Sequence, residues 1–211
     1  MASLPWVSTT PSARRHHLAH HFSRDGALGL ARCHIGLASP ATFTVALRVP
    51  GWCRRFQVEV NRKRVAAKAV KGYAKVRRRW QDGDDVSIRM DMPVEHIAAH
   101  PAVADDAGRA AIQRGPLVYC LEQCDHPGAP VRAIALPDGA ALKPVWDARL
   151  LGGCMTVRGR GLAPAGAGGQ GALYRPARAA PKRSTVRIRA IPYFLWDNRR
   201  AGAMAAWLPR A

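Results

Sequence analysis

Short runs in which apolar and polar residues alternate constrain the fold of this chain more than any other feature. In ATFTVALRVP, residues 41–50, the apolar side chains of Phe43, Val45, Leu47 and Val49 alternate with threonine, alanine and arginine. A period of two places such residues on one face of a β-strand and their neighbours on the other. We therefore expect half-buried strands, and comparable runs follow in FQVEVN (56–61), GYAKVRRRW (72–80) and VSIRMDMPV (86–94).

Further strand-like segments occupy the second half of the chain. AAIQRGPLVYCLE (110–122) is predicted to be one strand that is bulged or bent at Arg114–Pro116. Sixteen prolines and nineteen glycines separate these short runs, which is typical of an all-β protein. The other candidate strands are VRAIAL (131–136), ALKPVW (141–146), GGCMTVRG (152–159), TVRIRAIPYFLW (185–196) and GAMAAWLP (202–209).

The expected architecture is two antiparallel β-sandwich or jelly-roll-like units, residues 41–98 and residues 99–211. The four runs of the first unit are expected to form one antiparallel sheet, because their connections are short. HIAAHPAVADDAGR (96–109) is interpreted as a linker with a tight turn. Residues 1–40 are rich in serine, arginine and histidine without any apolar period, so we expect an irregular, poorly ordered segment.

No membrane or targeting segment is expected. No stretch is apolar over the roughly 18 residues that a membrane-spanning helix needs. In MASLPWVSTTPSARRHHLAHH the charges follow a weakly apolar part, the reverse of a secretory leader. We therefore expect cytoplasmic localisation with reduced thiols, since five scattered cysteines do not suggest a disulfide framework: Cys33, Cys53, Cys120, Cys124 and Cys154.

The segment AAIQRGPLVYCLEQCDH (110–126) raises the question of a metal site. Cys120 and Cys124 have a spacing that zinc sites sometimes use, and Asp125 and His126 could complete a tetrahedron. Residues four apart on a strand, however, lie about 13 Å from one another. We therefore interpret Cys120 as a small buried residue, and no metal site is predicted.

Other patterns that could carry chemistry are weak. His16 with His20 and His17 with His21 have the spacing of zinc-binding helices, but no glutamate or third ligand accompanies them. GAGGQG (166–171) lacks the strand and helix of a phosphate-binding loop. Paired carboxylates are not evident among Glu59, Glu95 and Glu122, and the aspartates at 82–85 and 105–106 are typical of turns.

The charge balance favours anionic partners. There are 33 lysine and arginine residues against 14 acidic ones, a formal charge of +19, which attracts nucleic acid regardless of sequence. Basic residues at Arg62–Arg64 and Lys71–Arg79 are interleaved with Tyr73 and Trp80, as in a sheet on which bases stack. Alternation alone also explains Lys75, Arg77 and Arg79, as the solvent face of an antiparallel strand.

Several motifs taken in order resemble the region that follows the catalytic barrel in glycoside hydrolase family 127. RGPLVYCLE (114–122) and IPYFLWDNR (191–199) carry most of the resemblance, which covers residues 41–211. The other motifs are LRVPGWC (47–53), VN (60–61), KGYAKVRRRWQDGDDVSIRMDMPV (71–94), AHPAV (99–103), GRAAIQ (108–113) and MAAWLP (204–209).

The resemblance implies β-L-arabinofuranosidase chemistry in another part of the enzyme. Family members hold zinc with cysteines and a glutamate in an (α/α)₆ barrel, where a thiolate attacks the sugar and another glutamate is the acid/base. This sequence has no vicinal cysteine pair, and Cys53 and Cys120 lie in sandwich motifs, so no catalytic, cofactor-binding or metal-binding residue is carried over. Residues 7–40 depart from the family pattern and suggest a degraded or frame-shifted gene start.

We therefore expect a non-catalytic accessory module, a truncated remnant whose partner in full-length relatives is the barrel. The alternative is a basic domain that binds nucleic acid or another polyanion weakly through strand faces. A third hypothesis is carbohydrate binding, with Trp52, Tyr73, Trp80 or Trp196 stacking on sugar rings. The oligomeric state is left open.

Overall fold

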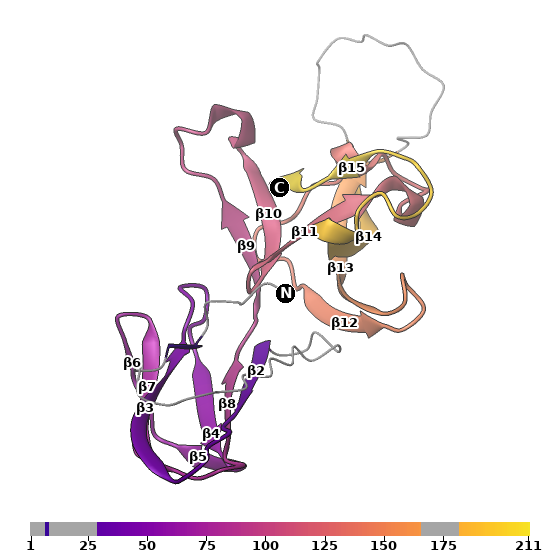
Figure 1. Ribbon diagram of the computed structural model, residues 1–211. Coiled ribbons are helices and arrows are strands. Elements are labelled where there is room, and N and C mark those ends of the chain that lie inside the picture. The colour runs from indigo at the N-terminus through magenta and orange to yellow at the C-terminus, as the bar shows by residue number, and fades with distance from the viewer. Residues whose placement is uncertain (1–6, 9–28, 166–181) are drawn as a thin grey trace. The chain divides into compact units, whose positions relative to one another are not determined.

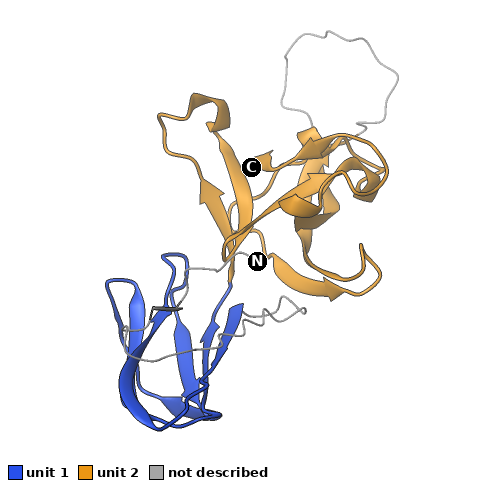
Figure 2. Ribbon diagram, viewed as in Figure 1, with its two compact units in different colours: residues 1–92 blue, residues 93–211 orange. Residues whose placement is uncertain are grey.

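The computed structural model describes residues 7–8, 29–165 and 182–211, and these residues form β-strands with a few short 3₁₀ helices (Figure 1). The chain divides into two compact units, residues 1–92 and residues 93–211 (Figure 2). The predicted all-β, antiparallel fold class is confirmed. Within the described ranges there is no helix with the length and apolar character needed to cross a bilayer.

The first unit contains two four-stranded antiparallel sheets. One has the order β1-β3-β7-β6 and the other the order β2-β8-β4-β5. The strands are β1 (Val7–Ser8), β2 (Gly29–His34), β3 (Ala41–Arg48), β4 (Phe56–Val60), β5 (Lys63–Val65), β6 (Ala69–Val70), β7 (Tyr73–Trp80) and β8 (Asp85–Met90).

The core of this unit is built from the alternating positions that the sequence predicts. Val45 of β3 and Val58 of β4 are buried with Ile88 of β8 in one hydrophobic cluster, although β3 belongs to a different sheet from β4 and β8. The prediction of a single sheet is therefore wrong. Each run is apolar on one face only, so two sheets bury those faces against each other.

Strand β2 lies inside the segment that was expected to be irregular. It pairs with β8 over its full length, from Gly29 opposite Met90 to His34 opposite Asp85. Its buried positions are Gly29 and Cys33, which give almost no apolar alternation to detect. The expectation for residues 1–40 is thus wrong at residues 29–34, and also at Val7–Ser8, which pair with β3; residues 1–6 and 9–28 lie outside the described residues.

The second unit is an eight-stranded antiparallel sheet with the order β12-β13-β14-β11-β10-β16, to which β15 adds beside β11 and β9 beside β10. Its strands are β9 (Val94–Ala98), β10 (Arg109–Arg114), β11 (Leu117–Glu122), β12 (Lys143–Asp147), β13 (Cys154–Pro164), β14 (Arg183–Pro192), β15 (Met204–Ala205) and β16 (Trp207–Pro209). Its 3₁₀ helices are η1 (Ala104–Asp106), η2 (Gln123–Asp125), η3 (Val131–Ala133) and η4 (Tyr193–Leu195).

The boundary between the units falls at residues 92 and 93, not at 98 and 99. β9 pairs with β10 from Ala98 opposite Ala110 to Val94 opposite Arg114, so residues 94–98 belong to the second unit. The expected strand over 86–94 ends at Met90, and a separate strand, β9, begins at Val94 directly after Pro93. The expected linker is the connection between two paired strands.

Two segments of the second unit fold differently from the expectation. The predicted bent strand over 110–122 is a hairpin, because Arg114 pairs with Leu117 across a two-residue loop that begins at Gly115, φ +56°. Glycine suits the first central position of such a turn. The predicted strand over 131–136 begins as η3, so only Ala135 and Leu136 make bridges.

Candidate functional site

The two thiols of the segment 110–126 occupy different environments. Cys120 lies within β11 and is 1% exposed, and burial, together with the nearby Glu122 carboxylate, raises the pKa of its thiol to about 12. Cys124 lies in η2 and is exposed. Cys120 therefore packs as a small apolar residue in the cluster with Ile191.

The chain does bring acidic groups together, which sequence analysis did not anticipate. Ligand atoms of Glu122, Cys124 and Asp125 all lie within 4.8 Å of one another, and His126 is not part of this group. The grouping arises because β11 ends at Glu122 and the single turn of η2 folds the chain back. A straight strand would have kept these residues apart, so the sequence pattern did not predict their grouping.

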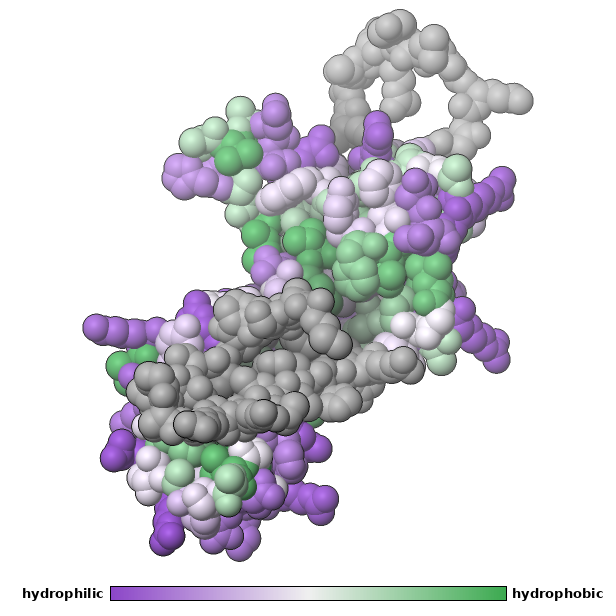
Figure 3. Space-filling model, viewed as in Figure 1, coloured by the Kyte–Doolittle hydropathy of each residue, from purple (hydrophilic) through white to green (hydrophobic). Residues whose placement is uncertain are grey.

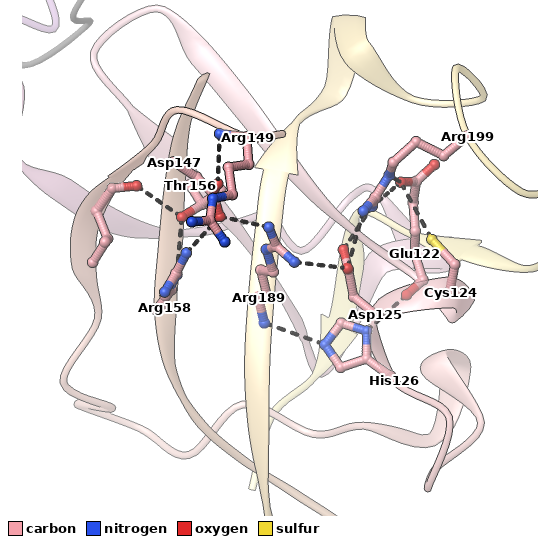
Figure 4. A network of polar contacts seen from close by, with 11 residues as sticks. Glu122, Cys124, Asp125, His126, Asp147, Arg149, Thr156, Arg158, Arg189 and Arg199 are labelled. Carbon is pink, nitrogen blue, oxygen red and sulfur yellow. Dashed lines mark hydrogen bonds and ion pairs between the residues drawn. The ribbon is translucent and has the colours of Figure 1, made fainter. Parts of the chain in front are cut away.

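An arginine that is distant in the sequence binds both carboxylates (Figure 4). Arg199 donates from Nε to Glu122 Oε2 at 2.8 Å, and its Nη2 also donates to that oxygen. It donates to Asp125 from Nη1 to Oδ1 at 3.0 Å and from Nη2 to Oδ2 at 2.6 Å. The side chain of Arg199 is 16% exposed, that of Glu122 is 6% exposed and that of Asp125 is 7% exposed, so this ion-pair cluster is largely desolvated.

A second arginine extends the network across the sheet. Arg189 of β14 donates to Asp125 Oδ1 at 3.3 Å and to Asp147 Oδ2 at 2.6 Å. Asp147 also accepts from Nη2 of Arg158 at 2.7 Å, and Arg158 Nε donates to Thr156 Oγ1 at 3.2 Å. Strands β12, β13 and β14 are thereby joined by side chains to the end of β11 (Figure 4).

His126 joins backbone groups beneath this network. Its Nε2 accepts a hydrogen bond from the Arg189 N–H at 3.2 Å, and its Nδ1 lies 2.7 Å from the Glu122 carbonyl oxygen. Because Nε2 accepts, the proton belongs on Nδ1, from which it is donated to that carbonyl. His126 is 4% exposed and serves as a structural bridge.

The charges of the cluster balance and stabilise one another. Although burial alone would raise the pKa of Asp147, the Arg149 N–H and the guanidinium groups of Arg189 and Arg158 hold that pKa below its ordinary value. Hydrogen bonds from Arg199 to Asp125 and Glu122 raise the pKa of Arg199 despite its burial. Three carboxylates thus face three guanidinium groups, from Arg158, Arg189 and Arg199.

This pairing determines what the cluster can do chemically. Retaining glycosidases use two carboxyl groups about 5–5.5 Å apart, and a metal ion also favours such a group of acids. Here the guanidinium of Arg199 occupies the side of Glu122 and Asp125 that a sugar oxygen or a cation would approach. Burial also raises the pKa of the Cys124 thiol, which disfavours the thiolate that zinc binds. The arrangement is that of a structural ion-pair cluster.

The cluster positions a loop that exposes aromatic side chains. We call residues 193–199 the aromatic loop. Its Asp197 N–H donates to Glu122 Oε1 at 3.2 Å, and Asn198 Nδ2 donates to the carbonyl oxygens of Leu195 and Trp196. The exposed fractions of its aromatic residues are large, namely 45% for Tyr193, 66% for Phe194 and 38% for Trp196.

Large apolar side chains that gather on one exposed loop are a common feature of interaction surfaces. The rings of Tyr193 and Trp196 lie 5.9 Å apart, so the aromatic groups gather in one place. The second unit also presents hydrophobic surface on the side shown in Figure 3, where it appears in green. The aromatic loop is therefore the candidate functional site of this unit.

The other residues singled out from the sequence lie apart from this site. Trp80 is fully buried and donates from Nε1 to the Phe43 carbonyl oxygen at 3.1 Å, while Trp52 and Tyr73 are partly buried. Of the four aromatic residues considered for sugar stacking, Trp196 alone is exposed. Glu59 forms an ion pair with Arg89 at 3.8 Å. His16, His17, His20, His21 and residues 166–171 lie outside the described residues.

Models of known families match both units. Residues 20–92 match the model described as "Beta-L-arabinofuranosidase, GH127 middle domain", and residues 94–209 match "Glycoside hydrolase family 127 C-terminal domain". The boundary between the two matches coincides with that between the compact units.

Individual relatives agree with this assignment. The non-reducing end β-L-arabinofuranosidase of Bifidobacterium longum is 32% identical over 177 residues, which are 82% of this chain and 27% of that protein. The crystal structure of a GH127 β-L-arabinofuranosidase from Geobacillus stearothermophilus T6 matches with 38% identity and a TM-score of 0.80, over 92% of this chain and 30% of that one. A second structure, titled "Glycoside hydrolase", has 31% identity and a TM-score of 0.81, over 97% and 34%.

The chain thus spans about a third or less of the length of these relatives, which contain additional domains.

Proposed function

The chain belongs to glycoside hydrolase family 127, whose middle and C-terminal domains it contains, and we propose that these domains act without catalysis, by supporting a catalytic region. The catalytic region is the (α/α)₆ barrel that the family resemblance implies. The aromatic loop is the surface that docks against it.

The observation that carries this proposal is the exposure of Tyr193, Phe194 and Trp196 on a loop fixed by desolvated ion pairs. A loop that was exposed to water in its working state would gain nothing from three large aromatic side chains. Burying a side chain such as Phe194 is worth about 1.5–3 kcal/mol. Two-thirds or more of each relative's length lies outside the matched segment, which supports a partner region of the same enzyme.

The chemistry of the polar cluster favours a structural role over a catalytic one. Carboxylate oxygens of Glu122 and Asp125 lie within 4.8 Å of each other, and both side chains accept hydrogen bonds from Arg199. The zinc that the resemblance implies would need cysteine thiolates beside a free glutamate. Cys124 is the one thiol in this group, and the Glu122 carboxylate beside it is engaged, so these residues do not fit that ion.

A hydrolysis assay tests catalytic silence. The purified chain is incubated with p-nitrophenyl β-L-arabinofuranoside in the presence of zinc, and release of p-nitrophenol is followed. We expect no release above a protein-free blank. Release that disappears in the Glu122→Gln variant would contradict the proposal, because it would assign acid/base chemistry to the cluster.

A further inference from the structure

We propose that the first unit carries a binding surface for single-stranded nucleic acid along the chain from Arg62 to Arg79. This inference is independent of the aromatic loop, which belongs to the second unit. It assigns a ligand class to a strongly charged surface that support of a catalytic region does not require.

The charged residues of this surface are all basic. Between Glu59 and Asp82 the sequence has nine lysine and arginine residues and no acidic residue. All nine are exposed, and no described carboxylate forms an ion pair with any of them. Arg78 donates from Nε to the Arg79 carbonyl oxygen at 3.4 Å and lies over the Trp80 ring, whereas exposed cations that no described carboxylate pairs with can bind phosphates. The nine residues are Arg62, Lys63, Arg64, Lys68, Lys71, Lys75, Arg77, Arg78 and Arg79.

Strand β7 places part of this charge in a straight row. Ala74, Val76 and Trp80 are buried, so the outward positions are those of Tyr73, Lys75, Arg77 and Arg79. Successive residues on one face of a strand are about 6.7 Å apart, given a rise of 3.3–3.4 Å per residue. An extended polyanion can therefore engage several of these cations at once.

The neighbouring strand adds neutral donors and an aromatic end to the row. Thr44 of β3 lies opposite Arg77, and Thr42 lies opposite Arg79. Arginine, lysine and threonine are among the side chains that contact phosphates. At the other end Arg48 lies over the ring of Tyr73, at 5.3 Å from its centroid. Cations combined with aromatic rings are typical of surfaces that bind single strands.

Two of the cations occupy strained turn positions. Arg62 has φ +63° and Lys71 has φ +51°, in the left-handed region that favours glycine or asparagine. Both side chains are exposed, and the described part of the fold uses neither in a hydrogen bond or ion pair. Both positions belong to two-residue hairpin loops, between Val60 and Lys63 and between Val70 and Tyr73, which require positive φ, so the fold sets the backbone and leaves the two side chains available to a ligand.

Between these turns the edge of the unit is hollowed. A groove of about 680 Å³ is lined by apolar side chains together with Gln57, Arg64 and Lys68; the apolar ones are Phe56, Val58, Val65, Ala66 and Ala67. The size is that of small-ligand sites, and its apolar lining suits the face of an unstacked base. The groove lies beside β4 and β5, in a different sheet from β7, and Arg64 and Lys68 bring two of the nine cations to its lining.

The test measures binding of a fluorescein-labelled oligothymidylate to the purified full chain by anisotropy, over a series of salt concentrations. For single strands, log affinity falls with log salt by about 0.7 per phosphate contact. The variant K75A/R77A/R79A should therefore have a slope that is shallower by about 2. The matched control R132A/R183A/R200A removes the same charge from exposed positions of the second unit, and we expect its slope to stay close to that of the parent.

Arg62→Gly separates binding from folding. Glycine relieves the positive φ, so the thermal midpoint should stay equal or rise, while the slope becomes shallower by about 0.7. The proposal is overturned if the parent chain does not bind at low salt, or if the two triple variants lose affinity equally. It is also overturned if heparin binds more tightly than the oligonucleotide and only heparin binding responds to K75A/R77A/R79A or Arg62→Gly.

Discussion

The guanidinium of Arg199 donates hydrogen bonds to both carboxylate oxygens of Asp125, from Nη1 to Oδ1 at 3.0 Å and from Nη2 to Oδ2 at 2.6 Å. The two residues are 74 positions apart in the sequence. Such bidentate contacts fix the relative orientation of the two groups as well as their distance. They connect η2 to the end of the aromatic loop, which would otherwise have few constraints. These contacts hold the end of the loop against η2, and we expect this anchoring to reduce the entropy lost on docking.

Replacing Arg199 by methionine should strongly destabilise the second unit. The substitution leaves Glu122 and Asp125 as neighbouring carboxylates that are 6% and 7% exposed and lack their main cation. Removing one partner of a buried ion pair typically costs about 3–5 kcal/mol. Urea unfolding, followed by circular dichroism, measures this loss.

Two further variants make the Arg199 measurement specific. Arg55→Met removes an ion pair with Asp91 whose arginine side chain is 85% exposed, so stability should be nearly unchanged. The combination R199M/E122Q/D125N removes all three charges and should recover most of the loss. If R199M alone is as stable as the parent chain, the cluster does not hold the loop.

Asp147 should make stability depend on pH in the acidic range. Its folded pKa is lowered from 3.8, so its contribution is fully present above that value and is lost as pH falls through the folded pKa. Asp147→Asn should therefore be less stable than the parent at neutral pH. The difference should shrink below pH 3.8, as urea midpoints at several pH values would reveal. A difference that is independent of pH would contradict this interpretation.

Cys124 should be the cysteine that reacts first in the folded chain. It is exposed, whereas Cys33, Cys53, Cys120 and Cys154 are buried. At Cys33 and Cys120 burial both hinders access and raises the thiol pKa, to about 11 and about 12; the pKa of the Cys124 thiol is raised as well, so the expected preference rests on its exposure. Mass spectrometry after brief maleimide treatment should find one label, absent in Cys124→Ser. Rapid labelling of several sites would indicate that the units open readily.

The strands of the first unit were predictable where their side chains alternate strongly. The buried positions of β3 are Phe43, Val45 and Leu47 and those of β7 are Ala74, Val76 and Trp80, so the alternation is broken only at position 78, and the boundaries of both strands agree closely with the expected runs. β2 could not be recognised, because its buried positions are a glycine and a cysteine. Strand pairing was not predictable either: a one-sided apolar pattern shows which face is buried and does not identify the sheet that covers it.

The candidate site was predictable only in its parts. The two motifs that carry most of the family resemblance, RGPLVYCLE and IPYFLWDNR, contain Glu122 and Arg199 respectively. The contact between these two residues spans 77 residues of sequence. Asp125 was considered as a metal ligand beside Cys124, although its partner is an arginine. Local spacing cannot reveal such a contact, because only the sheet order β14-β11 brings the two motifs together.

The central claim is that the aromatic loop docks on a catalytic region, and a chimera tests it most directly. In the Geobacillus stearothermophilus relative, the matched segment is replaced by this chain, and Phe194→Ser is compared with Val118→Ser. Both side chains are exposed in this chain, at 66% and 42%, so neither substitution should change the melting of the isolated chain.

In the chimera, we predict that Phe194→Ser lowers the melting temperature by several degrees, consistent with the loss of about 1.5–3 kcal/mol of burial, and that Val118→Ser does not. Equal melting of the two chimeras, with unchanged hydrolysis of the arabinofuranoside, would contradict the claim.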